Sequence, residues 1–265
     1  TISDLSYTGT SSYAPRGIAV SSSVLAANVT ISDNTISGIT TSGTTTTQGI
    51  YAFGTLTEGV NILRNRISNV KNTNTGGYSA IGLALGSTST TANFRAANNF
   101  IWDVAGYGWT STTTDNGYGI NILSGGGYNL YHNSVHIATN QTTLTGNPAA
   151  LIISSTVTTA ASLDIRDNIF SITSANGTNR FAVLCNAANT VFSNINYNDY
   201  YSTGPNLGYI GAANQVDLAA WQTATAQDVN SISGDPGFVS NTDLHIQTTS
   251  NTVSNNGFYL ASVPT

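Results

Sequence analysis

An asparagine recurs at intervals of 30 to 35 residues through most of the chain, each time in a similar apolar setting. An apolar residue stands three positions before it and an apolar or aromatic residue two positions after it, as in VTISDNTIS (29–37) and LDIRDNIFS (163–171). A fixed period of this length is typical of a repeat architecture. The repeat around Asn98 differs from this pattern on its N-terminal side, where Arg95 takes the apolar position. One inserted residue would explain the difference. The six asparagines are Asn34, Asn65, Asn98, Asn133, Asn168 and Asn198.

A second apolar block recurs in phase with the first, for example GIYAF (49–53) and GYGINI (117–122). The apolar spacing in both blocks is two, which indicates strands rather than helices. The asparagine block contains two short strands, one on each side of the asparagine, and the second block supplies the other strand, so each repeat contains three. Since no single repeat could fold alone, successive repeats must stack as a solenoid. The predicted fold is all-β, a right-handed parallel β-helix with three short strands in each coil of about 30–35 residues.

The recurring asparagine has a structural explanation in such a fold. Asparagine tolerates left-handed backbone angles at a corner, and its amide can bond to the asparagine one coil above and below. We therefore expect a structural ladder. The alternative, a polar row that binds a ligand, is weaker because this corner points inward in such folds.

The two ends of the chain are predicted to differ. Residues 1–201 form the stacked coils, and residues 202–265 form the closing coils and the C-terminal cap or exit segment of the same domain. DLAAWQTATAQD (217–228) predicts a short helix with Asp217 as its N-cap. TISD (1–4) repeats TISD (30–33), so the chain is expected to begin inside a coil, without a cap. An uncapped end favours self-association or continuation of a longer chain there.

Composition limits the partners. Only 7% of residues are charged, the net charge is −5, and no basic patch exists to neutralise phosphates, so no nucleic acid is expected as a partner. No run of about 18 apolar residues is present, so no membrane insertion is expected. The single cysteine, Cys185, lies in an apolar run and predicts a buried inert thiol. No cofactor is expected.

The C-terminal quarter carries recognisable motifs in the order YNDYYS (197–202), LAAWQ (218–222), DVNSISGDPGFVS (228–240) and DLHIQ (243–247). This order resembles the closing coils of secreted right-handed parallel β-helix repeat proteins of Gram-negative bacteria. Those are large surface proteins with a pectate-lyase-like fold. The resemblance covers about residues 120–257 and implies an extracellular, cell-surface location, but it says little about activity. One motif departs, because SNTVSNNG (250–257) stands where those proteins usually have an SPAIDAG-type ending.

Catalytic candidates are few. Related β-helix lyases and hydrolases use clustered carboxylates, and glycoside hydrolysis needs two carboxylates about 5–9 Å apart. Stacking predicts that His132 lies over Asp167, a potential general-base pair, and Asp164 is the nearest further acid. The same stacking places Asp33 over Arg64. The favoured explanation of both pairs is cross-strand pairing at the surface, and no metal site is expected because no further acids accompany them.

The aromatic residues near the longest loop are candidates for binding. Trp102, Tyr107 and Trp109 lie beside amide and hydroxyl groups, a setting that suits sugar stacking or adhesion to other proteins, and ordinary packing explains them equally well. The first hypothesis is a non-catalytic extracellular structural or adhesive module of a bacterial surface protein, with a filament subunit assembling end to end as its sharpest version. The alternatives are a carbohydrate-active enzyme, a polysaccharide lyase or glycoside hydrolase, and a glycan-binding module.

Overall fold

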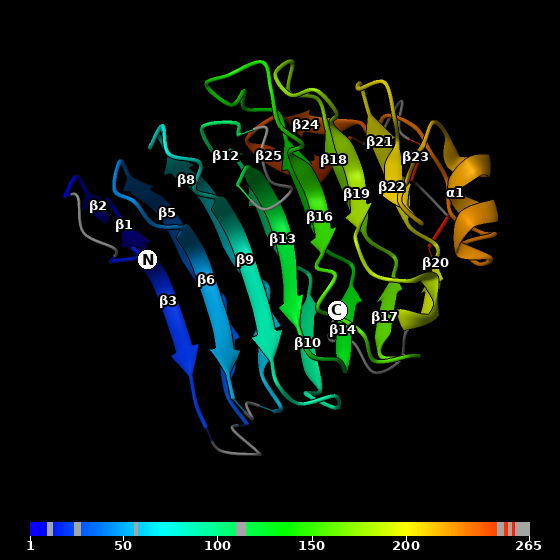
Figure 1. Cartoon of the computed structure of the whole chain (residues 1–265), viewed down its shortest axis with the longest axis horizontal. Helices are drawn as coiled ribbons and strands as arrows, with labels where there is room; N and C mark the ends of the chain where they lie inside the picture. The colour runs from blue at the N-terminus through cyan, green and yellow to red at the C-terminus, as the bar shows by residue number, and fades with distance from the viewer. Residues whose placement is uncertain are drawn as a thin grey trace.

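The computed structural model describes residues 1–9, 13–23, 28–55, 58–109, 115–247, 252–253 and 256–257. They form a parallel β-helix of about six coils. In Figure 1 the chain descends along the front, climbs along the back and advances from the N-terminal to the C-terminal side, so the winding is right-handed. The predicted fold class is confirmed.

Three parallel sheets form the walls, and each coil passes through sheet 1, sheet 2 and sheet 3 in that order. Sheet 1 contains β3 (Arg16–Ser21), β6 (Thr47–Gly54), β9 (Ala80–Ser87), β13 (Gly117–Ser124), β16 (Ala149–Ile153), β19 (Phe181–Cys185) and β22 (Gly208–Ile210). Sheet 2 contains β4 (Thr30–Ser32), β7 (Asn61–Leu63), β10 (Phe94–Ala97), β14 (Tyr128–Tyr131), β17 (Leu163–Arg166) and β20 (Phe192–Asn196). Sheet 3 contains β1 (Ile2–Ser3), β2 (Ser6–Tyr7), β5 (Thr35–Thr41), β8 (Arg66–Asn72), β11 (Phe100–Trp102), β12 (Val104–Ala105), β15 (Ser134–Ile137), β18 (Ile169–Ile172) and β21 (Asp199–Ser202).

Equivalent side chains of successive coils stack into rows that fill the interior. One row is fully buried along six coils, and burying each such side chain contributes about 1.5–3 kcal/mol. The row consists of Ile36, Ile67, Ile101, Val135, Phe170 and Tyr200.

A ladder of asparagine side chains closes the turn between sheets 2 and 3. Each Nδ2 donates to the Oδ1 of the next coil at 2.8–3.1 Å, and the same oxygen accepts the backbone N–H of the residue that donates to it. The members are Asn34, Asn65, Asn99, Asn133, Asn168 and Asn198.

The assignment of Asn98 to the ladder was wrong by one residue. Ala96 pairs with Ile62 and fills the inward position before the ladder, so the extra residue lies upstream and Asn99 is the buried ladder member. The left-handed backbone also belongs to the residue before each ladder asparagine, not to the ladder asparagine itself. This outward-facing left-handed column consists of Asp33, Arg64, Asn98, His132, Asp167 and Tyr197.

The chain begins beside a different strand from the one expected. Ile2 pairs with Ile36, so residues 1–4 stack on Thr35–Gly38 and not on the first TISD copy at 30–33. The cause is that TIS occurs on both sides of Asn34, in sheet 2 and again in sheet 3.

The C-terminal region closes the stack. The antiparallel strand β23 (Ala213–Gln215) pairs with β22, and α1 (Leu218–Thr225) follows with Asp217 as its N-cap, as predicted. A short 3-10 turn, η1 (Asn189–Val191), precedes β20. The hairpin of β24 (Phe238–Ser240) and β25 (Asp243–Ile246) then returns across the outer face of sheet 3, seen at the top of Figure 1.

Candidate functional site

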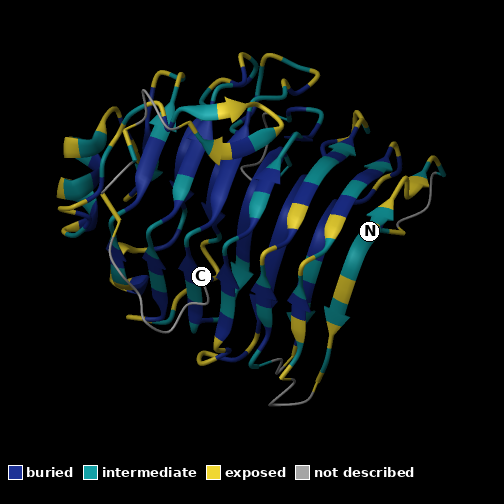
Figure 2. Cartoon of the chain, turned by 180° about the vertical axis from the view of Figure 1, so that it is seen from behind, coloured by how far each residue is buried: buried dark blue, intermediate teal, exposed yellow. Residues whose placement is uncertain are grey.

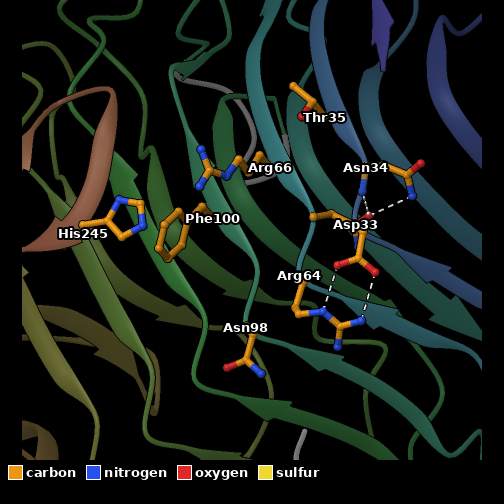
Figure 3. Close-up of a pocket in the computed structure, with 9 residues that line it drawn as sticks. Asp33, Asn34, Thr35, Arg64, Arg66, Asn98, Phe100 and His245 are labelled. Atoms are coloured by element: carbon orange, nitrogen blue, oxygen red, sulfur yellow. Dashed lines mark hydrogen bonds and ion pairs between the residues drawn. The ribbon is translucent and has the colours of Figure 1, made fainter. Parts of the chain in front are cut away.

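A pocket of about 390 Å³ opens on the outer side of the turn between sheets 2 and 3, near the N-terminal coils (Figure 3). Asp33 and Arg64 of the left-handed column form a bidentate ion pair there, with N–O distances of 2.8 and 2.9 Å. The hydrogen bonds from Arg64 lower the pKa of Asp33. Both side chains are solvent-exposed, so the predicted stacking of this pair produces a surface ion pair.

The other wall of the same pocket is built from three elements. Figure 3 shows Arg66, Phe100 and His245 side by side, with the Phe100 ring 5.2 Å from the His245 ring and 5.8 Å from the Arg66 guanidinium carbon. The hydrogen bonds from His245 lower the pKa of Asp243. This pocket therefore contains paired charges rather than a cluster of carboxylates, and it lacks the acid pair that glycoside hydrolysis needs.

His132 and Asp167 line a second pocket of about 200 Å³, together with Tyr197 and Asp199. The structure thus brings the two predicted residues together. Asp164 lies apart on the outer face of sheet 2, where it accepts hydrogen bonds from Arg166 (2.7 and 2.6 Å) and from the Tyr131 hydroxyl (2.7 Å). Asp164 does not line this pocket, so it is not a partner of His132 within it.

Asp199 is the notable residue of this second pocket. Its side chain is 2% exposed, Oδ1 accepts the backbone N–H of Gly234 at 3.2 Å, and Oδ2 has no hydrogen-bond partner. Burial raises the pKa of Asp199 to about 7. The repeat pattern gave no signal for this residue, because its position in sheet 3 faces outward in the other coils and is buried here only by the returning C-terminal residues.

The three aromatic candidates do not share one demonstrated site. Trp102 pairs with His136 on the outer face of sheet 3, next to the returning hairpin, and is half-buried. Trp109 covers Gly77 of the preceding loop so closely that a Cβ there would lie 2.6 Å from its ring. Tyr107 is half-buried in the same loop and its carbonyl accepts the N–H of Thr143. Packing between coils explains Trp109 directly.

The N-terminal edge of the stack is open. β3, β4 and the pair β1 and β2 each hydrogen-bond to a strand on one side only within the described residues. Four interior side chains of this first coil are only partly buried, whereas their partners in the next coil are fully buried; the four are Ile2, Ile18, Val20 and Val29. The ladder is open too, since Asn34 donates to Asn65 but its own Oδ1 accepts no hydrogen bond from the described residues. Figure 2 shows this gradient, with β3 largely teal and yellow and the later coils dark blue.

The C-terminal edge is closed. The last ladder residue, Asn198, donates its backbone N–H to Ser231 Oγ at 2.7 Å, and Ser231 in turn donates to the buried carboxylate of Asp228. The Tyr200 hydroxyl and Trp221 Nε1 donate to the same carboxylate at 2.6 and 2.7 Å. Burial raises the pKa of Asp228, and these donors oppose the shift. The ladder is thus terminated by a serine and an aspartate.

No protein-family model, curated protein or solved structure matches the chain. The resemblance to secreted β-helix proteins therefore rests on the C-terminal motifs alone. Among the described residues, no His, Cys, Asp or Glu side chains form a group of three or more that could hold a metal ion. Within that same part of the chain, no helix is both long and apolar enough to cross a membrane.

Proposed function

We propose that this chain is a non-catalytic structural or adhesive β-helical module of an extracellular bacterial protein, whose coil stack is extended at the N-terminal edge by a further parallel coil. The difference between the two ends carries the proposal. The C-terminal ladder residue is fully hydrogen-bonded, while Asn34 and the strands around it present free groups next to partly exposed core side chains. Unpaired strand edges of this kind bind other strands readily.

A parallel coil is the occupant that fits this edge. It would pair with β3, with β4 and with the pair β1 and β2, cover the partly buried Val20 and Ile18, and supply a donor to Asn34 Oδ1. A second copy stacking head to tail fits less well, because β23 and α1 cover the C-terminal coil. The geometry therefore favours a coil from a longer chain or from a different subunit over a filament of identical end-stacked copies.

Composition and motifs support the extracellular part of the proposal. A chain with only 7% charged residues is consistent with the resemblance to secreted β-helix proteins. Among the described residues, the 390 Å³ pocket lined by Asp33 and Arg64 has no pair of accessible carboxylates, which favours a structural role over catalysis there.

The edge can be tested by giving it a coil of known register. Thr1 is in register with Thr35 and Arg66, so a copy of residues 43–65 fused directly before Thr1 would place its final asparagine in the ladder. We expect the fusion to protect the amides of β3 and β4 from hydrogen exchange and to raise the free energy of unfolding. The matched control carries alanine at that final asparagine and should gain less. Unchanged exchange in both fusions would contradict the proposal.

A carbohydrate-active enzyme is the second candidate, and one observation favours it. The small pocket holds His132, Asp167 and Asp199, and a carboxyl group with a pKa of about 7 has the character of a general acid. Hydrolysis would be measured as reducing-sugar release from neutral and acidic polysaccharides. Activity that Asp199→Asn and Asp167→Asn both abolish would support the enzyme. Release by wild type that both variants retain would exclude this pocket as its source.

A further inference from the structure

The outer face of sheet 1 carries a second apolar layer and a pocket that neither the ladder nor the N-terminal edge uses. Ile120 and Ile122 face the interior core, so Asn121 between them faces outward. Around it lies an outer cluster separate from the interior, which includes Ile81, Ile152 and Leu184. A pocket of about 490 Å³ lies over this layer, within the size range of small-molecule sites.

Asn121 is an unsatisfied polar group in the wall of this pocket. Its side chain is 5% exposed, and its Oδ1 has no hydrogen-bond partner. Its neighbours in the same outward row are Ala84 and Ile152, neither of which can supply a donor from its side chain. A buried amide oxygen without a partner is costly, by an amount comparable to a lost hydrogen bond, and an absent ligand or water is one of its explanations.

The remaining lining has a consistent chemistry. The floor is aliphatic, with Ile81, Leu123 and Ile152. The walls are amides and hydroxyls, including Gln48 and Asn186. Among the described residues that line the pocket, Asp115 is the one ionisable side chain, which is too few carboxylates for a metal ion. At one end Arg16 Nε donates to Gln48 Oε1 at 2.7 Å, so the cation beside the pocket is already held by a lining amide.

The pocket is also elongated across the coils. Gln48 lies in the second coil and Asn186 follows the strand of the sixth, and four strand spacings correspond to about 19 Å. Tyr51 lies in the same outward row as Asn121, two strands away, with its ring half-buried on the sheet surface. The Arg16 guanidinium lies 3.9 Å from the centroid of that ring, so the ring already has a cation–π contact within the chain, and the apolar contact to a sugar falls to the aliphatic floor.

We propose that this pocket binds a neutral oligosaccharide, with Asn121 as its central polar contact. A pyranose has an apolar face that matches the floor and a rim of hydroxyls that both donate and accept, which satisfies both atoms of the Asn121 amide. An extended peptide fits less well, because its backbone groups need a sheet edge, and this pocket lies on a face whose backbone is already paired. This inference specifies a ligand class for the proposed adhesive role and rests on that role. It does not depend on what covers the N-terminal edge.

The test uses the whole chain and a panel of neutral trisaccharides built from glucose, mannose, galactose, xylose or N-acetylglucosamine, with trigalacturonate as the acidic comparator. NMR titration would follow the side-chain amide signal of Asn121. We expect at least one neutral trisaccharide at millimolar concentration to shift that signal. The proposal would be overturned if no trisaccharide shifts the signal or if trigalacturonate binds more tightly. Shifts confined to the pocket lined by Asp33, Arg64 and Arg66 would also overturn it.

Two variants localise the binding. Asn121→Ala copies the alanine found at the matching position of the third coil and should weaken binding by about 5- to 10-fold, the value of one hydrogen bond. Leu123→Trp fills the pocket and should abolish binding. Asn129→Ala changes the outer face of sheet 2 in the same coil, outside the pocket, and should bind as wild type. Equal affinities of the Asn121 and Asn129 variants would refute the site, even if the N-terminal fusion behaves as proposed.

Discussion

Replacing one interior ladder residue should cost more than twice as much stability as replacing the first one. In Asn133→Ala, the backbone N–H of Asn99 loses its acceptor at 3.1 Å and the carbonyl of Ala96 loses its donor at 2.9 Å. Asn168 Oδ1 keeps the backbone donor at position 133, so it is not stranded. The Asn99 N–H is left unpaired at about 1–3 kcal/mol. The lost bonds from Asn99 Nδ2, to the Ala96 carbonyl and to Asn168 Oδ1 add about 0.5–1.5 kcal/mol each, which predicts a total loss of about 2.5–7.5 kcal/mol.

Asn34→Ala is the matched control at the open end of the same ladder. Asn65 Oδ1 keeps the backbone N–H of residue 34 as a donor, and within the described part of the chain Asn34 Oδ1 accepts no hydrogen bond that the variant would lose. The variant loses the two bonds that Asn34 Nδ2 donates, to the Ser32 carbonyl and to Asn65 Oδ1, at about 0.5–1.5 kcal/mol each, so the expected cost is about 1–3 kcal/mol. Urea unfolding followed by tryptophan fluorescence gives both values, provided that the slopes of the two transitions agree. If Asn133→Ala costs no more than Asn34→Ala, the ladder is not the stabilising feature described above.

Three further outcomes follow from the core. Burial raises the pKa of Asp199 from 3.8 to about 7, so between these pH values the native state binds one more proton than the unfolded state. The free energy of unfolding of the wild type should therefore fall by about 4 kcal/mol as the pH rises from about 4 to 7. In urea unfolding, Asp199→Asn should show a flatter dependence of stability on pH. Trp221→Ala should cost about 3–5 kcal/mol in the same assay and loosen the C-terminal cap first, and an unchanged midpoint would contradict the capping role. Gly82→Ala should cost about 1–3 kcal/mol, because its Cβ would lie 2.4 Å from Ile101 Cγ2 and 2.7 Å from the Gly119 carbonyl oxygen; a neutral effect would show that the coil spacing adapts freely.

The repeat made the fold predictable, because the period of two and the recurring asparagine are imposed by the same stacking. The assignment failed only where the pattern is locally ambiguous. At FRAANNFIW (94–102) two asparagines are adjacent, and the alternation of Phe94, Ala96 and Ile101 as inward residues would have selected Asn99. At the N terminus, TIS flanks Asn34 on both sides, and sequence identity alone could not choose between sheet 2 and sheet 3.

The candidate sites were far less predictable. His132 and Asp167 are neighbours because they occupy equal positions in adjacent coils, which stacking predicts. Asp199 pairs with Ile232, accepts the N–H of Gly234 and shares its pocket with Val253 and Gly257, and the repeat pattern does not predict that these residues return to this position. Asn121 occupies the position that holds Ala84 in the preceding coil and Ile152 in the following coil. Its Oδ1 lacks a hydrogen-bond partner because of side chains from several coils, which the repeat pattern does not predict.

The central claim is that the stack is closed at one end and open at the other, and native-state hydrogen exchange of the chain alone tests it most directly. We predict that the amides of β3 and β4 exchange through local opening with small free energies, and that protection rises along the coils to β19 and β20, which exchange only on global unfolding. Protection of β3 and β4 equal to that of β13 and β14 would show that the first coil is as firmly held as the middle of the stack, and would contradict the account.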